Sequence, residues 1–261
     1  MFFTKKRTDG ADVLREYARI GLVDMHSHVL PRIDDGSESV ERSIEMLTAS
    51  YEQGVRKIVA TPHFYPDMMS PADFLARRDV SARALGAAIR EQTADGNCLP
   101  TLYVGAEVAY FDGISRSEAV AELCISGTRL LLVEMPFGRW SESDVRELMS
   151  LKSKGFQPVV AHYDRYYVYQ EKGLLERLCD WGIYVQINAE AFLRFATKRQ
   201  AISMMSMGAV SFLGTDCHNM TTRIPNMAEA LGVIEGRLGR DAIEELMKEA
   251  SARLDGAEAL A

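Results

Sequence analysis

The chain has 261 residues, of which 47% are hydrophobic and 26% charged, a composition typical of a soluble globular protein with one large or two small domains. Its net charge of −7 disfavours non-specific nucleic-acid binding, which requires a basic surface. The first ten residues, MFFTKKRTDG, lack an apolar signal core, and no apolar run approaches membrane-spanning length, so we expect a cytoplasmic protein without membrane insertion.

Short β-rich runs alternate with longer amphipathic segments along the chain. The predicted strands span residues 22–26, 57–61, 101–107, 130–134, 158–162, 183–188 and 210–215. The predicted helices span residues 39–53, 72–91, 142–154, 172–181, 190–207, 227–237 and 240–252. This alternation with short connections is typical of parallel βα units in an α/β fold.

Helix ends and chain organisation follow from the same pattern. Ser37 is the predicted N-cap of the first of these helices. Four glycines follow helical segments as stop signals, namely Gly54, Gly155, Gly182 and Gly208. Because no internal repeat or linker is evident, we predict one domain over residues 22–261. A helical appendage at residues 1–21 precedes it and packs an apolar stripe on the domain's exterior.

Each predicted strand ends in, or is directly followed by, side chains that can bind a metal ion or a phosphate. In chain order these are Asp24, His26 and His28, then His63, Glu107, Glu134, His162, Gln186 and Asn188, and finally Asp216 and His218. In a β/α barrel the carboxyl ends of the strands gather at one mouth, where active sites are built. All five histidines of the chain lie within three residues of a predicted strand end, which predicts one shared metal centre.

Local geometry and donor chemistry narrow this prediction. Residues two apart in an extended segment point to the same side, so His26 and His28 can face one ion, as can Asp216 and His218. The donors are imidazoles and carboxylates without a cysteine motif. That set favours manganese, iron or zinc in a catalytic cluster over a structural thiolate zinc site.

The segments DMHSHVLPRIDDG, VATPH, GAEV, LLVEMP, AHYDRY and GTDCHN, in this order, resemble the polymerase-and-histidinol-phosphatase (PHP) superfamily. More narrowly, they resemble the bacterial manganese-dependent protein-tyrosine phosphatases of capsule and exopolysaccharide operons. The match runs from about Leu22 to the C-terminal helices. The resemblance implies a distorted β/α barrel of about seven parallel strands that holds up to three ions, manganese first, with iron, zinc or magnesium as further options.

The resemblance also implies a set of site residues. Carried over position by position, the metal ligands are His26, His28, Asp35, His63, Glu107, Glu134, His162, Asp216 and His218. Arg165 in AHYDRY and Arg223, five residues beyond the last histidine, match the family's phosphate-binding positions. A guanidinium suits that task because it binds phosphate oxygens in two-point fashion and stays charged at any working pH.

Two loops depart from the family's pattern. The family commonly has AHPERY where this chain has AHYDRY, so Tyr163 and Asp164 change the loop and Asp164 receives no role. Arg32 stands where many relatives have glycine in LPGIDDG. It either adds a cation beside the mouth or points to solvent, and we favour solvent. The acids that follow, Asp34 and Asp35, suit a tight turn that folds a carboxylate back over the mouth.

These residues predict a phosphatase that hydrolyses protein phosphotyrosine with a metal-activated hydroxide, while Arg165 and Arg223 hold the phosphate oxygens. The resemblance implies that the substrate is the tail of a bacterial tyrosine kinase in capsule or exopolysaccharide synthesis. The same site could instead hydrolyse a small phosphomonoester such as histidinol phosphate or a nucleotide, because a fold does not fix its substrate. Non-catalytic metal binding is the least favoured class.

A cysteine-dependent mechanism is a further alternative, because Cys217 and Arg223 match the C-x5-R signature of such phosphatases. That loop wraps backbone amides round the phosphate and usually needs glycine, and the five intervening residues contain none. We therefore disfavour a thiolate nucleophile and expect Cys217 to point into the barrel wall. With no CxxC pair, all four cysteines are expected to be reduced and mostly buried.

Overall fold

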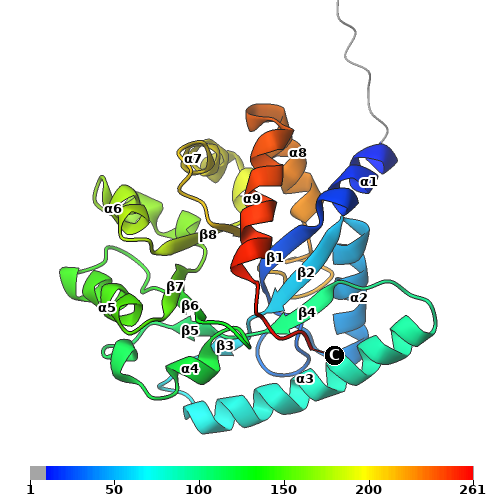
Figure 1. Ribbon diagram of the computed structural model, residues 1–261, viewed down its shortest axis with the longest axis horizontal. Helices are drawn as coiled ribbons and strands as arrows, with labels where there is room; N and C mark the ends of the chain where they lie inside the picture. The colour runs from blue at the N-terminus through cyan, green and yellow to red at the C-terminus, as the bar shows by residue number, and fades with distance from the viewer. Residues whose placement is uncertain (1–9, 261) are drawn as a thin grey trace, which may run out of the picture.

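The computed structural model describes residues 10–260, which form an α/β fold with parallel strands at the centre and helices around them (Figure 1). The strands are β1 (Leu22–Ser27), β2 (Val55–Ala60), β3 (His63–Phe64), β4 (Thr101–Val104), β5 (Glu107–Ala109), β6 (Leu130–Glu134), β7 (Gln157–Val160), β8 (Tyr184–Asn188) and β9 (Phe212–Gly214). Every pairing between these strands is parallel.

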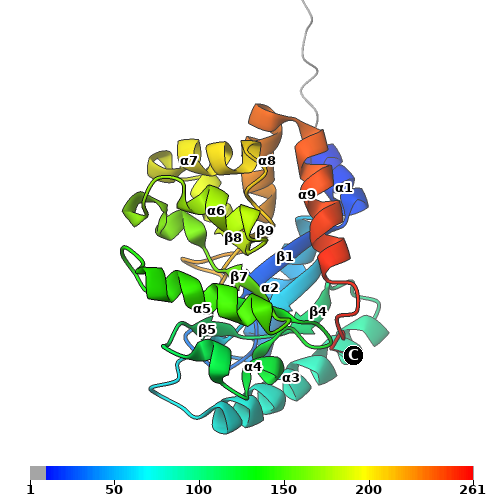
Figure 2. The same ribbon diagram turned by 60° about the vertical axis from the view of Figure 1, so that its left-hand side comes forward.

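The helices follow the strands in the alternation that the sequence predicted. The α-helices are α1 (Gly10–Ile20), α2 (Val40–Glu52), α3 (Pro71–Ala94), α4 (Val120–Leu123), α5 (Glu142–Ser153), α6 (Leu174–Asp180), α7 (Phe195–Ser206), α8 (Met227–Leu238) and α9 (Arg240–Arg253). Short 3-10 helices are η1 (Ile114–Arg116), η2 (Tyr163–Arg165), η3 (Tyr167–Tyr169) and η4 (Ala189–Phe192). Figures 1 and 2 show the helices on the outside of the strands.

The strands form two sheets that are joined to each other. One sheet has the order β1-β2-β4, and the other has the order β3-β5-β6-β7-β8-β9. Only Thr61 and Pro62 separate β2 from β3, so the chain passes from the first sheet into the second almost without a break. At the other side a parallel bridge pairs Ser27 of β1 with Cys217, just beyond β9. The carboxyl ends of all these strands therefore lie close to one another.

One long strand of the prediction is divided in the structure. Residues 101–107 were expected to form a single strand, but they form β4 and the start of β5. Backbone pairing continues across the gap, because Gly105 N donates to the carbonyl of Ala60 (2.9 Å) and Glu107 N donates to that of Pro62 (3.0 Å). Pro62 has no N–H to donate in return, so the regular ladder is interrupted beside it.

The helix predicted over residues 190–207 is also divided, into η4 and α7. Arg194 between them has an extended backbone (φ −76°, ψ 133°), which no helical turn can accommodate. The segment that follows β8 is consequently bent at the point where it leaves the strand.

The N-cap of α2 differs by two residues from the prediction. Ser37 is not the N-cap of α2: the N-cap is Ser39, two residues later, whose side chain accepts the N–H of Arg42 (3.2 Å). The Ser37 hydroxyl donates instead to the Ser39 carbonyl (2.9 Å).

The four predicted stop glycines all have positive φ, with +97° at Gly54, +82° at Gly155, +66° at Gly182 and +70° at Gly208. Glycine suits these positions because it has no Cβ.

Helix α1 lies on the outside of the strands, beside α9 (Figures 1 and 2). Its Tyr17 is buried, and the Tyr17 hydroxyl donates to Glu235 of α8 (2.9 Å). The appendage predicted at residues 1–21 thus includes a packed helix, while residues 1–9 lie outside the described part of the chain. Within residues 10–260, no helix has the length and apolar character needed to cross a membrane.

Candidate metal centre

The nine predicted ligands lie together at the carboxyl ends of the strands. They form four groups in which one donor atom per residue lies within 4.8 Å of the others. The groups are His28, Asp35, His63 and His218; His26, Glu107 and His162; His26, His28 and Asp216; and His63, Glu107 and Glu134. Several residues belong to two groups, so the groups make up one continuous cluster.

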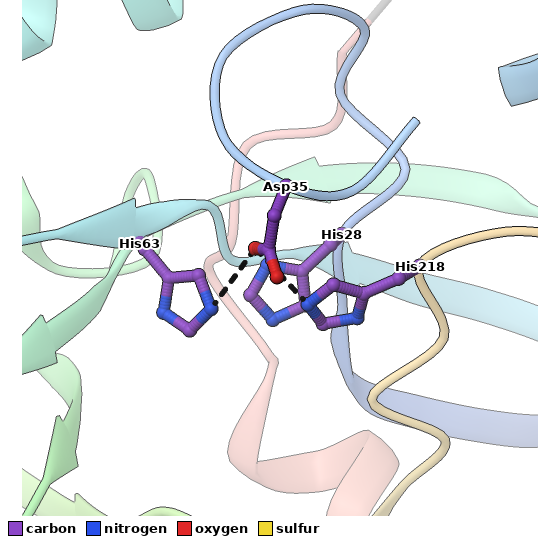
Figure 3. A group of neighbouring side chains, drawn as sticks. All are labelled: His28, Asp35, His63 and His218. Carbon is purple, nitrogen blue, oxygen red and sulfur yellow. Dashed lines mark ion pairs between the residues drawn. The ribbon is translucent and has the colours of Figure 1, made fainter. Parts of the chain in front are cut away.

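Asp35 lies over three imidazoles of this cluster (Figure 3). Its Oδ1 atom is 3.5 Å from Nε2 of His63 and 3.4 Å from Nε2 of His218. The ring centroids of His28 and His218 are 3.8 Å apart. The Asp35 side chain is 68% exposed, whereas those of His28 and His218 are buried. Asp35 thus stands on the solvent side of the group, on the loop that follows β1.

Glu107 stands at the centre of the cluster. Its Oε2 atom is 2.9 Å from Nδ1 of His63 and 3.2 Å from Nε2 of His26, and its Oε1 atom is 2.6 Å from Nε2 of His162. The Glu107 side chain is fully buried. One carboxylate from β5 therefore contacts imidazoles delivered by β1, β3 and the end of β7.

The donor atoms do not all satisfy one another by hydrogen bonds, and bound metal ions would satisfy the remainder. The Nε2 atoms of His26 and His28 are only 3.1 Å apart, and two such nitrogens attract only when a proton or a cation lies between them. Glu107 Oε2 and Asp216 Oδ1 have charged neighbours but no well-aligned hydrogen bond, and buried His218 Nε2 has no hydrogen-bond partner. Orphaned polar atoms are costly in a protein interior, and coordination to a cation would satisfy them.

The protonation states of the cluster are shaped by its burial and its charges. Burial acts to raise the pKa of the Glu107 carboxyl, but His26 and a hydrogen bond with His162 hold that pKa well below its usual value. Burial lowers the pKa of His162 to about 4, so its imidazole is neutral. Burial also acts to lower the pKa of His28, but neighbouring acids, with Asp216 first, raise it well above its usual value. Ligation requires neutral imidazoles, so His28 would release a proton when an ion binds.

Asp34, for which no separate role was predicted, orients His28. Its Oδ2 atom is 2.8 Å from Nδ1 of His28 and accepts the backbone N–H of His63 (3.0 Å), while its Oδ1 atom accepts that of Gly36 (2.9 Å). A carboxylate on Nδ1 turns Nε2 of the same ring toward the cluster and increases its basicity. In the sequence, the only sign of this role is the pair of acids before Gly36. Asp35 covers the mouth of the site, and Asp34 contacts the far side of the His28 ring.

Two amide side chains of β8 orient three of the proposed ligands. Gln186 Oε1 lies 3.2 Å from Nδ1 of His26 and accepts the backbone N–H of His162 at 2.6 Å. Gln186 Nε2 donates to Asn188 Oδ1 (2.9 Å), and Asn188 Nδ2 donates to Asp216 Oδ2 (3.0 Å). Because an amide oxygen can only accept, His26 carries its proton on Nδ1 and presents Nε2 to the cluster. The sequence marked both amides as able to bind a metal or phosphate, and the structure shows this orienting contact instead.

The backbone is left-handed at two non-glycine residues of the site, with φ +31° at His162 and +53° at Asp216. Such conformations cost about 1–3 kcal/mol each and cluster at functional sites. The expectation that Asp216 and His218 face one ion assumed an extended backbone. With left-handed Asp216 the two residues fall in different groups, and His218 Nδ1 lies 2.9 Å from the Asp216 carbonyl.

The two predicted phosphate-binding arginines converge beside the cluster. Arg165 donates to Asp216 Oδ2, and Nη2 of Arg223 lies 2.7 Å from Asp216 Oδ1. Their side chains are 40% and 37% exposed, so both guanidinium groups are accessible from solvent. A buried cluster of metal ligands thus meets two accessible cations at one carboxylate, an arrangement suited to binding an anion such as phosphate.

Residues 22–254, nearly the whole chain, match the protein family described as "Capsular polysaccharide synthesis, CpsB/CapC". The chain belongs to this family.

Relatives within and near this family extend the comparison. The chain is 29% identical over 225 residues to tyrosine-protein phosphatase YwqE of Bacillus subtilis, which covers 84% of this chain and 86% of that protein. It is 31% identical over 239 residues to tyrosine-protein phosphatase CpsB of Streptococcus pneumoniae, covering 86% of this chain and 94% of that protein. A structure reported among "YwqE from Bacillus subtilis and CpsB from Streptococcus pneumoniae, unique metal-dependent tyrosine phosphatases" superposes with a TM-score of 0.79 at 27% identity. It covers 91% of this chain and 96% of the solved chain.

In this CpsB/CapC member the C-x5-R segment is not shaped as a phosphate cradle. Asn219 Oδ1 accepts the backbone N–H groups of Thr221 (3.0 Å), Thr222 (2.8 Å) and Arg223 (3.1 Å), so these amides are already engaged. Cys217 is fully buried, and burial raises the pKa of its thiol well above the usual range. A protonated thiol inside the wall of the domain is not a nucleophile.

The two loops that depart from the PHP pattern have structural explanations. Arg32 has φ +58°, the left-handed conformation that glycine adopts most easily, and its side chain is exposed, as expected. Arg32 Nε donates to the carbonyl of Glu38 (3.1 Å). Asp164 is turned inward and accepts the backbone N–H of Asn188 (2.9 Å). It therefore helps to position the end of β8, which carries Gln186 and Asn188.

Proposed function

We propose that this CpsB/CapC family member is a metal-dependent protein-tyrosine phosphatase. The observation that carries the proposal is the single cluster of nine imidazole and carboxylate ligands that meets two arginines at Asp216. Its relatives are named tyrosine-protein phosphatases, and the solved relative is described as metal-dependent. These names favour phosphotyrosine over histidinol phosphate or a nucleotide as the substrate.

We infer that the nine residues hold up to three ions, with manganese first and iron, zinc or magnesium as alternatives. Four overlapping donor groups support several adjacent ions over one, because each group offers three or four ligands. When bound, the ions would polarise a phosphoryl oxygen and lower the pKa of a coordinated water from about 15.7 toward neutrality.

The chain's own residues would bind and orient the phosphate. Arg165 and Arg223 would hold its non-bridging oxygens and balance the charge that develops during reaction, and both remain charged at any working pH. Gln186 and Asn188 keep ligands fixed beforehand, so little reorganisation is needed. A tyrosinate leaving group, with a reference pKa of about 10, needs less help from a general acid than a serine alkoxide.

We also infer that the two sheets form one distorted β/α barrel of about seven strands, of the PHP type. In that arrangement β2 with β3, and β4 with β5, each count as one interrupted strand. The bridge between Ser27 and Cys217 supports closure between β1 and β9. The barrel domain would comprise residues 22–261, with residues 1–21 as its N-terminal appendage.

We infer further that the protein substrate is the tyrosine-rich tail of a bacterial tyrosine kinase in capsule or exopolysaccharide synthesis, and that the enzyme works in the cytoplasm. The family description refers to capsular polysaccharide synthesis, which supports this setting. The net charge of −7 is compatible with a protein partner and unsuited to nucleic acid.

The test is a side-by-side assay of a phosphotyrosine peptide, a phosphoserine peptide and histidinol phosphate with Mn²⁺. We expect the phosphotyrosine peptide to be hydrolysed fastest, and EDTA to abolish turnover until Mn²⁺ is restored. Faster hydrolysis of histidinol phosphate, or turnover that survives EDTA, would overturn the proposal.

A second experiment separates the metal route from the thiolate route. Because Cys217 is buried and protonated, Cys217→Ser should keep phosphotyrosine turnover within about twofold and keep its sensitivity to EDTA. Cys124→Ser, at another buried cysteine, controls for the loss of a packed thiol. Inactivity of the folded Cys217→Ser protein alone would favour a thiolate nucleophile.

A further inference from the structure

Exposed large apolar side chains gather on the loops that follow the strands' carboxyl ends. We call six of them the apolar rim: Tyr65, Met68, Phe137, Tyr169, Phe195 and Ile224. They come from the five segments that follow β3, β6, β7, β8 and β9; Tyr169 lies in η3, and Phe195 is the first residue of α7. Met68 is 79% exposed, Phe137 76% and Phe195 fully exposed. Concentrated exposed apolar surface usually marks a place where a partner binds.

The apolar rim adjoins the metal centre. The Tyr65 ring stacks on that of His63, with centroids 5.2 Å apart and planes 23° apart. Ile224 directly follows Arg223, one of the two arginines beside the cluster. Phe137 packs edge-on against Tyr169, with centroids 5.0 Å apart, so these two rim residues form one small aromatic surface.

A cavity of about 290 Å³ opens between the rim and the cluster. Asp35 and His63 line it on the side of the metal centre. Met68, Phe74 and Arg77 are among the residues on its other side. Met68 and Phe74 therefore form an apolar wall of the cavity within reach of the group that would be hydrolysed. Phe74 lies in α3 and Met68 in the loop before it, and Figure 2 shows this loop on the same side of the molecule as the loop before α5.

We propose that the apolar rim is the docking surface for the residues that flank phosphotyrosine in an extended segment of a protein substrate. The inference rests on the proposed phosphatase function and adds a preference for apolar or aromatic flanking residues. The cavity beside His63 takes up one of those side chains, and Phe137 with Tyr169 packs against the segment on the far side of the mouth. A membrane is the less favoured partner, because a lipid surface on this rim would cover the mouth through which the phosphate must enter.

The experiment compares three substrates with the Mn²⁺-loaded full-length enzyme. They are p-nitrophenyl phosphate, a phosphotyrosine peptide with leucine and phenylalanine on both sides, and the same peptide with serines in those places. For the native enzyme we expect kcat/KM to be about tenfold higher for the apolar peptide than for the serine peptide, mainly through KM. If neither peptide is hydrolysed while p-nitrophenyl phosphate is, the proposed substrate class fails and not the rim alone.

Two rim variants and two matched controls complete the test. Met68→Ser and Phe195→Ser should each lower the ratio of kcat/KM for the apolar peptide to that for p-nitrophenyl phosphate by about fivefold. Met207→Ser and Val80→Ser, at exposed apolar residues outside the rim, should leave this ratio unchanged. All four side chains are exposed, so folding should be retained, which thermal melting checks.

Three results would overturn the proposal. One is an equal kcat/KM of the native enzyme for the two peptides. Another is an equal loss of the peptide ratio in rim and control variants. The third is sedimentation of the enzyme with phosphatidylcholine–phosphatidylglycerol vesicles that Phe195→Ser abolishes while peptide kinetics do not change, since that result would assign the rim to a membrane.

Discussion

The two ends of the strands use left-handed backbone in different ways. Where helices return toward the strands' amino ends, the left-handed residues are glycines, such as Gly54 and Gly208. At the carboxyl ends they include His162 and Asp216, which have side chains and accept the strain. The glycines make turns at little cost, whereas the strained residues direct ligands into a site. One end of the fold is therefore built for stability and the other for chemistry.

The largest effect should come from removing a ligand at the carboxyl ends. Asp216→Ala deletes a buried carboxylate that belongs to one donor group and also contacts both arginines. We expect Mn²⁺-dependent turnover of a phosphotyrosine peptide to fall by at least about a thousandfold. His162→Ala should behave in the same way. Steady-state kinetics with added Mn²⁺ measure the loss, and near-normal turnover in either variant would contradict the proposed ligand set.

Two glutamines sharpen the comparison, because Gln186 contacts the ligands and Gln157 lies at the amino end of a strand. Gln186→Leu removes the acceptor that orients His26, so metal affinity should fall by about tenfold to a hundredfold. Gln157→Leu, at the start of β7, removes hydrogen bonds to Lys152 and Gly182 instead and should leave metal affinity unchanged. Titration of the apo proteins with Mn²⁺, followed calorimetrically, measures both. Equal losses would show that the two ends are not functionally distinct.

Gly54→Ala tests the end that is built for stability. A Cβ at Gly54 would lie 2.9 Å from both the backbone N of Ala18 and the Cβ of Tyr17, at φ +97°. We expect the free energy of unfolding to fall by about 2 kcal/mol or more. In Gly208→Ala the Cβ meets open space, so a loss of about 1 kcal/mol is expected. Urea unfolding gives both values, and the activity per folded molecule should not change in either variant.

Arg32→Gly should produce the smallest change. Glycine adopts φ +58° without the side-chain strain, which should stabilise the fold by about 1 kcal/mol, less the hydrogen bond to Glu38. Arg32→Ala keeps the strain and loses the bond, so it should be no more stable than the native protein. Both variants lack the Arg32 side chain, so a glycine variant that melts below the alanine variant would contradict the strain assigned to the backbone at this position.

The sequence predicted most of the framework and all of the proposed ligands except Asp35, because these ligands lie at or just beyond the ends of apolar runs and the carboxyl ends of parallel strands meet. Asp35 lies in a loop and was assigned as a ligand only by the family resemblance. It could not predict how the ligands are held. Gln186 contacts His26 and His162, which are distant in the sequence and come from different strands. The left-handed turn at Asp216 was also hidden, because no glycine marks it. The interruption between β4 and β5 could have been predicted from Pro62, because proline has no N–H to donate to a strand ladder.

The Asn219 side chain has a practical consequence for motif searching. A C-x5-R pattern identifies cysteine-dependent phosphatases only when its loop amides are free to receive a phosphate, and here one asparagine oxygen occupies three of them. An asparagine two positions after the cysteine is visible in a bare sequence. Together with the absence of glycine, it offers a simple filter that would keep chains like this one from being sorted into the wrong class of enzyme.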